Sequence, residues 1–291
     1  MIFLEHLWGL LLLLVIVLGP VPISLWLSSI NQDKKLQYSL ADNLLVLLTV
    51  WCAIQIFIAL TLGAIHQFFL IPVIGFELIL FLSGAVILFF SQKLSPKFLF
   101  QKLFRSDLSF SRAEVLILSS IALTGVVLLI KLFTEVIIDY DSLWYHLPIM
   151  ARWYQEGSFV RLDEFLNSGD WVSDAISYYP FNWEILCILF VMPFQEDALV
   201  ALPNLVAYAI LGLSIYLLSL SIGASRLYSM AGACLVLTIP LIIQHVNSLH
   251  VDLPFAAFFM VALYFVISFN RSRSSASHFC DEYKCLSLIF E

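Results

Sequence analysis

The chain has 291 residues, of which 62% are hydrophobic and only 12% are charged, and its mean hydropathy is +0.98. A soluble domain is about half apolar and about a quarter charged, so this composition excludes a soluble globular protein and predicts a bilayer around most of the chain. The net charge of −7 gives no indication of nucleic-acid binding.

Seven apolar runs reach the length of about 20 residues that crosses a bilayer, at 7–28, 43–64, 68–90, 113–134, 198–220, 228–245 and 251–269. A further run, 184–194, is closed by Pro193 and is too short to cross, so it predicts a half-buried or re-entrant helix. The expected fold is an all-α polytopic membrane protein of about seven transmembrane helices, with a large first outer loop that carries juxtamembrane helices.

Lysine and arginine predict the orientation, because cytoplasmic loops are enriched in them. Loop 91–112 carries five of these residues and loop 29–42 carries two, so both are expected in the cytoplasm, and the acidic loop 135–183 outside. With this orientation, Arg226 and Arg271 lie in the cytoplasm only if the run 184–194 does not cross the membrane. The expected location is the inner (plasma) membrane, with the active face outside the cytoplasm.

The same reading divides the chain into three parts. Residues 1–112 form three amino-terminal spans and a basic cytoplasmic loop, 113–270 form a membrane core with the outer loop 135–183, and 271–291 form a polar cytoplasmic tail.

The stretch "IIDYDSLWYHLPIMARWYQEG", residues 137–157, follows the fourth span directly. Asp141 and Ser142 are good helix N-caps and Asp139 is a plausible one, while Pro148 suits a first turn and Gly157 a stop. A short helix on the outer leaflet is expected, with an apolar stripe of Leu147, Met150, Ala151 and Tyr154. From spacing alone, the aspartates serve either as caps only or as chemical groups.

A second polar stretch, "HVNSLHVDLP", places His245, His250 and Asp252 at the outer ends of the last two spans. It predicts either an interfacial turn in which Asp252 caps the last span, or a divalent-metal site, because carboxylate and imidazole are ordinary ligands. Between the two stretches, Glu184 in "YYPFNWE" is either another cap or a group that points into a cavity. Gln55 and Glu77 are isolated in apolar runs, and an intramembrane Glu is a functional hypothesis by default.

The order of these motifs resembles the GT-C glycosyltransferases. The form "DSLWYHLP…W…G" is most similar to the bacterial dolichyl-phosphate-mannose/aminoarabinose-transferase-like proteins, and "YYPFNWE", a short apolar helix, "EDALVALPNLV" and "HVDLP" follow in the family's order. The resemblance covers about residues 113–270.

This resemblance implies an enzyme that transfers a sugar from a polyprenyl-phosphate-linked donor to a glycan, lipid or protein acceptor at the outer face. Asp141 matches the catalytic acid of the first loop and Asp252 the second acid, and Asp139 is a weaker catalytic match. A carboxylate base would take the acceptor's proton, and positive charge or a metal would stabilise the phosphate leaving group. The expected substrate-binding residues are Tyr145, His146, Arg152, Glu184 and His250. A Mg²⁺ or Mn²⁺ ion is expected on Asp141, His250 and Asp252.

Two alternatives stay open. A transporter or flippase of a lipid-linked or anionic solute would use the acids as ion sites, although acids at span ends and the lack of a clear repeat favour the enzyme. The chain also has three spans before the first motif and ends after the seventh span, whereas family members usually continue further. A split enzyme with a downstream-encoded second half, or an inactive truncated remnant, is therefore an expectation as well.

Overall fold

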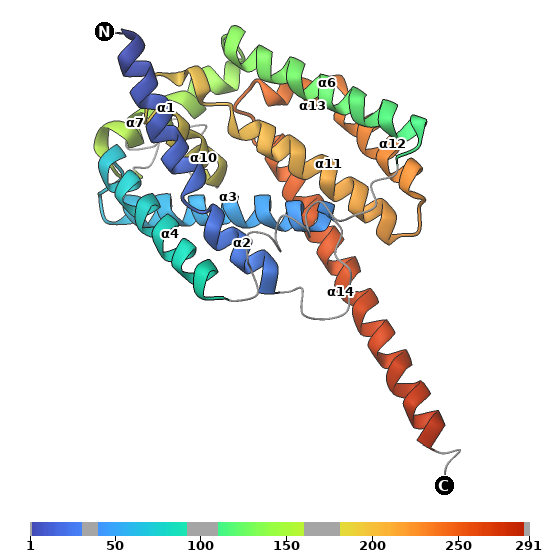
Figure 1. Cartoon of the computed structure of the whole chain (residues 1–291). Coiled ribbons are helices and arrows are strands. Elements are labelled where there is room, and N and C mark those ends of the chain that lie inside the picture. The colour runs from blue at the N-terminus through green and yellow to red at the C-terminus, as the bar shows by residue number, and fades with distance from the viewer. Residues whose placement is uncertain (1, 31–39, 92–109, 160–180, 288–291) are drawn as a thin grey trace, which may run out of the picture.

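The computed structural model describes residues 2–30, 40–91, 110–159 and 181–287, and these ranges contain helices and no strand. In chain order the helices are α1 (Ile2–Leu18), α2 (Val21–Ile30), α3 (Leu40–Ala64), α4 (Leu70–Phe90), α6 (Arg112–Thr134), η2 (Ser142–His146), α7 (Leu147–Glu156), α10 (Asn182–Val191), η3 (Asp197–Leu199), α11 (Pro203–Ser221), α12 (Arg226–Leu237), α13 (Pro240–Val246) and α14 (Asp252–Ser287). They form one bundle, from which α14 projects toward the C-terminus (Figure 1).

Six segments are long and apolar enough to cross a membrane: His6–Ser28, Leu40–Ala64, Leu70–Phe90, Arg112–Thr134, Asp197–Ser221 and Asp252–Asn270. A seventh is formed if α12 and α13 count as one span bent by 65°. The bend lies at Ile239, which is extended because the residue before a proline is disfavoured in the α region. The predicted all-α polytopic membrane fold is confirmed, and the spans agree with the apolar runs to within a few residues.

The helices differ in how much of their surface other helices cover. Of the 18 most apolar consecutive residues in each span, 61% are buried in the span that contains α11, but only 11% in α6. Ile71, Phe89 and Leu116 are 84%, 83% and 71% exposed, which is acceptable where lipid is the solvent. The centre of the protein is therefore α11, which packs against α14, α12 and α3.

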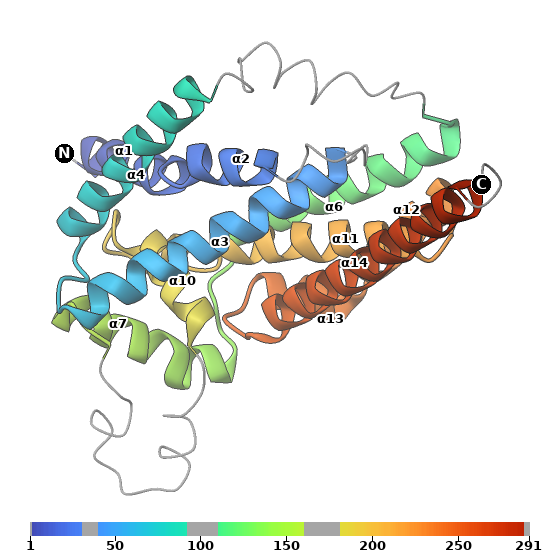
Figure 2. The same cartoon turned by 90° about the horizontal axis from the view of Figure 1, so that it is seen from below.

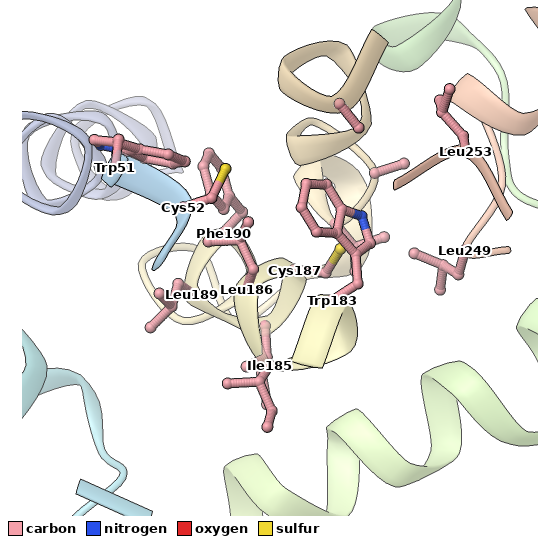
Figure 3. Close-up of a cluster of buried hydrophobic side chains, with 14 of the residues drawn as sticks. Trp51, Cys52, Trp183, Ile185, Leu186, Cys187, Leu189, Phe190, Leu249 and Leu253 are labelled. Carbon is pink, nitrogen blue, oxygen red and sulfur yellow. The ribbon is translucent and has the colours of Figure 1, made fainter. Parts of the chain in front are cut away.

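The short helix α10 lies inside the bundle, where it packs against α3, α7 and α11 (Figure 2). All its residues from Trp183 to Phe190 are buried. Trp51 and Cys52 of α3 lie on one side of it, and Leu249 and Leu253 lie on the other, near Trp183 (Figure 3). The predicted short helix is confirmed, and it is buried over Trp183 to Phe190, while Asn182 at its start is exposed.

Contacts between distant segments show which helix ends lie at the same side. Arg226 Nε at the start of α12 lies 3.1 Å from Glu114 Oε1 at the start of α6. At the opposite side, the Phe68 N–H between α3 and α4 donates to Gly157 O after α7 at 2.8 Å. This is the arrangement expected if α10 does not cross. Which side faces the cytoplasm stays a prediction.

The polar segment after Asn270 continues α14 as a helix to Ser287. The expected boundary between the membrane core and the tail at 270/271 is therefore not a break in secondary structure. It is a change in composition along one helix.

Candidate functional site

The helix after α6 begins at Asp139. Its side chain accepts a hydrogen bond from the Ser142 N–H at 2.9 Å, and its carbonyl accepts one from the Leu143 N–H at 3.2 Å, as an N-cap residue does. Asp141 makes no capping hydrogen bond. The expectation that ranked Asp141 above Asp139 as the cap is wrong, because the helix starts two residues earlier.

A π-helix, η2, separates this start from α7. π-helical turns are rare and often occur at functional sites. Ser142 in η2 is fully buried, and its hydroxyl accepts a hydrogen bond from the Leu249 N–H at 2.8 Å. This bond joins η2 to the segment between α13 and α14, 107 residues further along the chain.

His250 connects the two predicted motifs. Its Nε2 lies 3.2 Å from Asp139 Oδ1, and its Nδ1 lies 3.8 Å from Asp141 Oδ2. The side chain of Asp141 is 44% exposed, whereas that of Asp139 is 22% exposed. We call this group the acid–histidine site: Asp139, Asp141, His245, His250 and Asp252.

Part of the acid–histidine site could hold a metal ion. His245, His250 and Asp252 each offer one ligand atom, and these atoms lie within 4.8 Å of one another. The Nδ1 atom of His245 is buried and has no hydrogen-bond partner among the described residues. Asp141 borders the group through its contact with His250. The predicted set of Asp141, His250 and Asp252 therefore shares two members with this one, and His245 takes the third place.

Asn204 near the start of α11 holds the backbone that carries His245. Its Oδ1 accepts a hydrogen bond from Trp183 Nε1 at 2.7 Å. Its Nδ2 lies 2.5 Å from Ser248 O and 3.3 Å from the carbonyl oxygens of His245 and Val246. The sequence interpretation missed Asn204, although a polar residue directly after Pro203 at the start of an apolar span was a usable signal.

His146 and Glu184 form a buried pair. His146 Nδ1 lies 2.7 Å from Glu184 Oε1, and the two side chains are 2% and 3% exposed. The pair joins η2 to α10. Both residues were expected to bind substrate, and that role stays a prediction; the structure shows that they are buried and lie next to each other. His146 Nε2 and Glu184 Oε2 have no hydrogen-bond partner within the described ranges.

The remaining predicted residues lie on η2 and on α7. Tyr145 is half-buried, and its ring centroid is 4.0 Å from that of His146. Arg152 pairs with Glu156, one turn further along α7. Arg161, which could also have met a phosphate, lies outside the described residues.

The buried face of α7 differs from the expected stripe. Ile149, Met150 and Trp153 are buried, whereas Ala151 is exposed. Trp153 packs edge-on against Phe159 and Phe181, with ring centroids 5.1 and 5.6 Å away, so it is a core residue and not a headgroup anchor. The neighbouring segments decide which face is inward.

No family model, curated protein or solved structure matches the chain.

Proposed function

We propose that the chain is a GT-C-type glycosyltransferase, which transfers a sugar from a polyprenyl-phosphate-linked donor to an acceptor at the outer face of the membrane. One observation carries the proposal: the two acids that the family resemblance selects, Asp141 and Asp252, both adjoin His250 although they are far apart in sequence. An acidic cluster at the end of a helical bundle fits a reaction that needs an ionised base beside the phosphate of a lipid-linked sugar donor.

The two aspartates of the outer loop take different roles in this proposal. Asp141 is the base, because it is partly exposed and its side chain is not used in capping. Asp139 is a positioning residue, because it caps the helix and contacts His250. The acceptor's hydroxyl or amine would lose its proton to Asp141 as it attacks the anomeric carbon, and the donor's phosphate would leave with the bonding electron pair.

The metal proposal changes with the ligand set. Two imidazoles and one carboxylate resemble the three protein ligands of catalytic zinc sites, whereas Mg²⁺ prefers oxygen ligands. We therefore propose Zn²⁺ in place of the expected Mg²⁺ or Mn²⁺. A bound divalent cation would offset negative charge on the leaving phosphate.

Zinc binding can be measured by calorimetry on the purified full chain. His245→Ala should weaken it at least about tenfold, since even residues that only support a ligand change metal affinity by about 10- to 100-fold. His6→Ala, at an exposed histidine of α1, is the matched control. Equal affinity in the wild type and His245→Ala would remove the metal from the proposal and leave the base assignment untouched.

The decisive test is transfer of radiolabelled sugar from a polyprenyl-phosphate donor in membranes, normalised to protein level. Asp141→Asn should lower transfer by at least about 100-fold, because general-base catalysis contributes about 10²- to 10⁴-fold. Asp139→Asn should lower it less, since Asn caps a helix about as well as Asp. Near-normal transfer by Asp141→Asn would contradict the proposal.

A transporter or flippase is the second candidate. The observation that favours it is an interruption of the first span beside the buried Glu77, since transporters often bind ions at interrupted spans. Solute flux in proteoliposomes that depends on Glu77 and not on Asp141 would favour this candidate over the enzyme.

A further inference from the structure

The first span is interrupted at Gly19 and Pro20, between α1 and α2. Pro20 has no N–H, so it leaves the carbonyl of Ile16 without its helical donor. Gln55 Nε2 of α3 donates to Ile16 O at 2.6 Å. One turn away on α3, Trp51 Nε1 donates to Val17 O at 2.9 Å. The polar residues of α3 therefore satisfy the carbonyls that the interruption exposes, as a segment in lipid requires.

Glu77 of α4 faces the same interruption. It is fully buried, and a Cβ atom built on Gly19 would lie only 2.0 Å from Glu77 Oε2. The glycine thus leaves the space that the carboxyl occupies. Helix α4 packs against both α1 and α2 (Figures 1 and 2).

The polar atoms around Glu77 do not suit an ionised carboxylate. The Gln55 side chain of α3 is a polar neighbour of the carboxyl. Yet neither oxygen of Glu77 has a hydrogen-bond donor in the described part of the chain, and Gln55 Oε1, an acceptor, is also buried without a partner. A proton on the Glu77 carboxyl group would supply the donor that these buried acceptors lack.

Among the described helices around Glu77, which are α1, α2, α3 and α4, no Lys or Arg is present to compensate a charge. The other titratable side chains of these helices are Glu5, His6, Asp42 and Cys52. Glu5 and His6 lie about 20 Å along α1 from Gly19, Asp42 lies about 20 Å along α3 from Gln55, and Cys52 is uncharged as a thiol. A lone carboxylate in this setting is strongly unfavourable.

We propose that Glu77 and Gln55 form a proton-binding site inside the membrane-spanning part of the protein, at the interruption of the first span. Glu77 holds a proton there, and its hydroxyl is the donor for which Gln55 Oε1 is the free acceptor. The ligand is a proton taken from water, and no other reactant is needed. This site is separate from the acid–histidine site and does not rest on the proposed transferase activity.

Infrared spectroscopy of the full chain in lipid nanodiscs at neutral pH tests the proposal. The wild type should show the carbonyl absorption of a protonated carboxylic acid, and the difference spectrum against Glu77→Gln should contain this band. Glu135→Gln, at a partly exposed glutamate paired with Lys131, is the control and should leave the band in place. A difference spectrum of Glu77→Gln without the band would overturn the proposal.

Two further measurements keep the test decisive if Glu77→Gln folds poorly. Gln55→Met keeps Glu77 but removes its acceptor, so the band should shift in frequency; an unshifted band would overturn the pairing. Thermal melting of the wild type with and without NaCl, at equal ionic strength held by choline chloride, should give equal midpoints. A midpoint raised by sodium would identify a bound cation in place of the proton and would also overturn the proposal.

Discussion

Carboxylates occur in two regions of this protein that give them opposite surroundings. At the acid–histidine site, Asp139 and Asp141 lie 3.2 and 3.8 Å from an imidazole nitrogen, and Asp141 is partly exposed. Among α1–α4, Glu77 is fully buried beside a neutral amide on helices without Lys or Arg. A carboxyl group is therefore suited to act in its ionised form at the end of the bundle, and to carry a proton in its neutral form within the bundle.

The comparison also shows how each region satisfies its backbone. At the acid–histidine site, side chains such as Ser142 and Asn204 bind the main chain of a non-helical connection. In the first span, Gln55 binds the Ile16 carbonyl, which Pro20 leaves without a donor, and Trp51 binds the Val17 carbonyl beside it. Both regions depart from regular helix and both are supported by a neighbouring helix or turn, but only the first has a partly exposed carboxylate, that of Asp141.

A lysine in place of one carboxyl residue in each region should give the largest difference between them. Glu77→Lys places a cation beside Gly19, where there is little room and no described side chain offers an anion, and Lys at a membrane-helix centre costs about 3 kcal/mol. We expect little folded protein in membranes. Asp141→Lys, at a partly exposed position, should change the free energy of unfolding by at most about 0.5 kcal/mol. Equal losses, measured by membrane expression and thermal melting, would mean that the two environments do not differ.

Removal of the Asn204 amide should have the next largest effect. Asn204→Leu leaves the Trp183 N–H and the Ser248 carbonyl buried and unpaired, which costs about 1–3 kcal/mol. Zinc affinity should fall as well, because the same amide holds the backbone at His245. Asn247→Ala, at the end of α13, is the matched control. Unchanged melting and zinc affinity in Asn204→Leu would show that the connection is held by other contacts.

The smallest effect separates the two outer-loop aspartates. Asp139→Ala removes an N-cap and should lower the free energy of unfolding by about 1 kcal/mol, whereas Asp139→Asn should be nearly neutral. Asp141→Ala should also be nearly neutral in a thermal melt, since Asp141 caps nothing. The reverse order of the two alanine variants would restore Asp141 as the cap and weaken its assignment as a base.

Local sequence signals predicted the helices better than they predicted the site. The two predicted motifs, 137–157 and 245–254, do meet at His250, and topology alone had placed them at one membrane surface. The cap was assigned to the wrong aspartate because Asp139 and Asp141 both fit the N-cap preference, and the π-helix η2 is not visible in apolar spacing. The burial of His146 and Glu184 and their contact with each other could not be predicted, because a sequence does not report burial.

What the sequence by itself determined is the membrane fold: long apolar runs must cross, a ten-residue run cannot, and hydrocarbon requires helices whose backbone is satisfied internally. What only the tertiary structure decided is which polar groups meet. Glu77 and Gln55 looked isolated because their neighbours, Gly19 and Ile16, belong to the first span and lie far away in the sequence. Asn204 looked like an ordinary span residue because its partners lie more than 40 positions away, at His245, Val246 and Ser248. Apolar burial depends on average composition, which spacing records, whereas hydrogen bonds and ion pairs depend on distances of about 3 Å that arise only once the helices are packed.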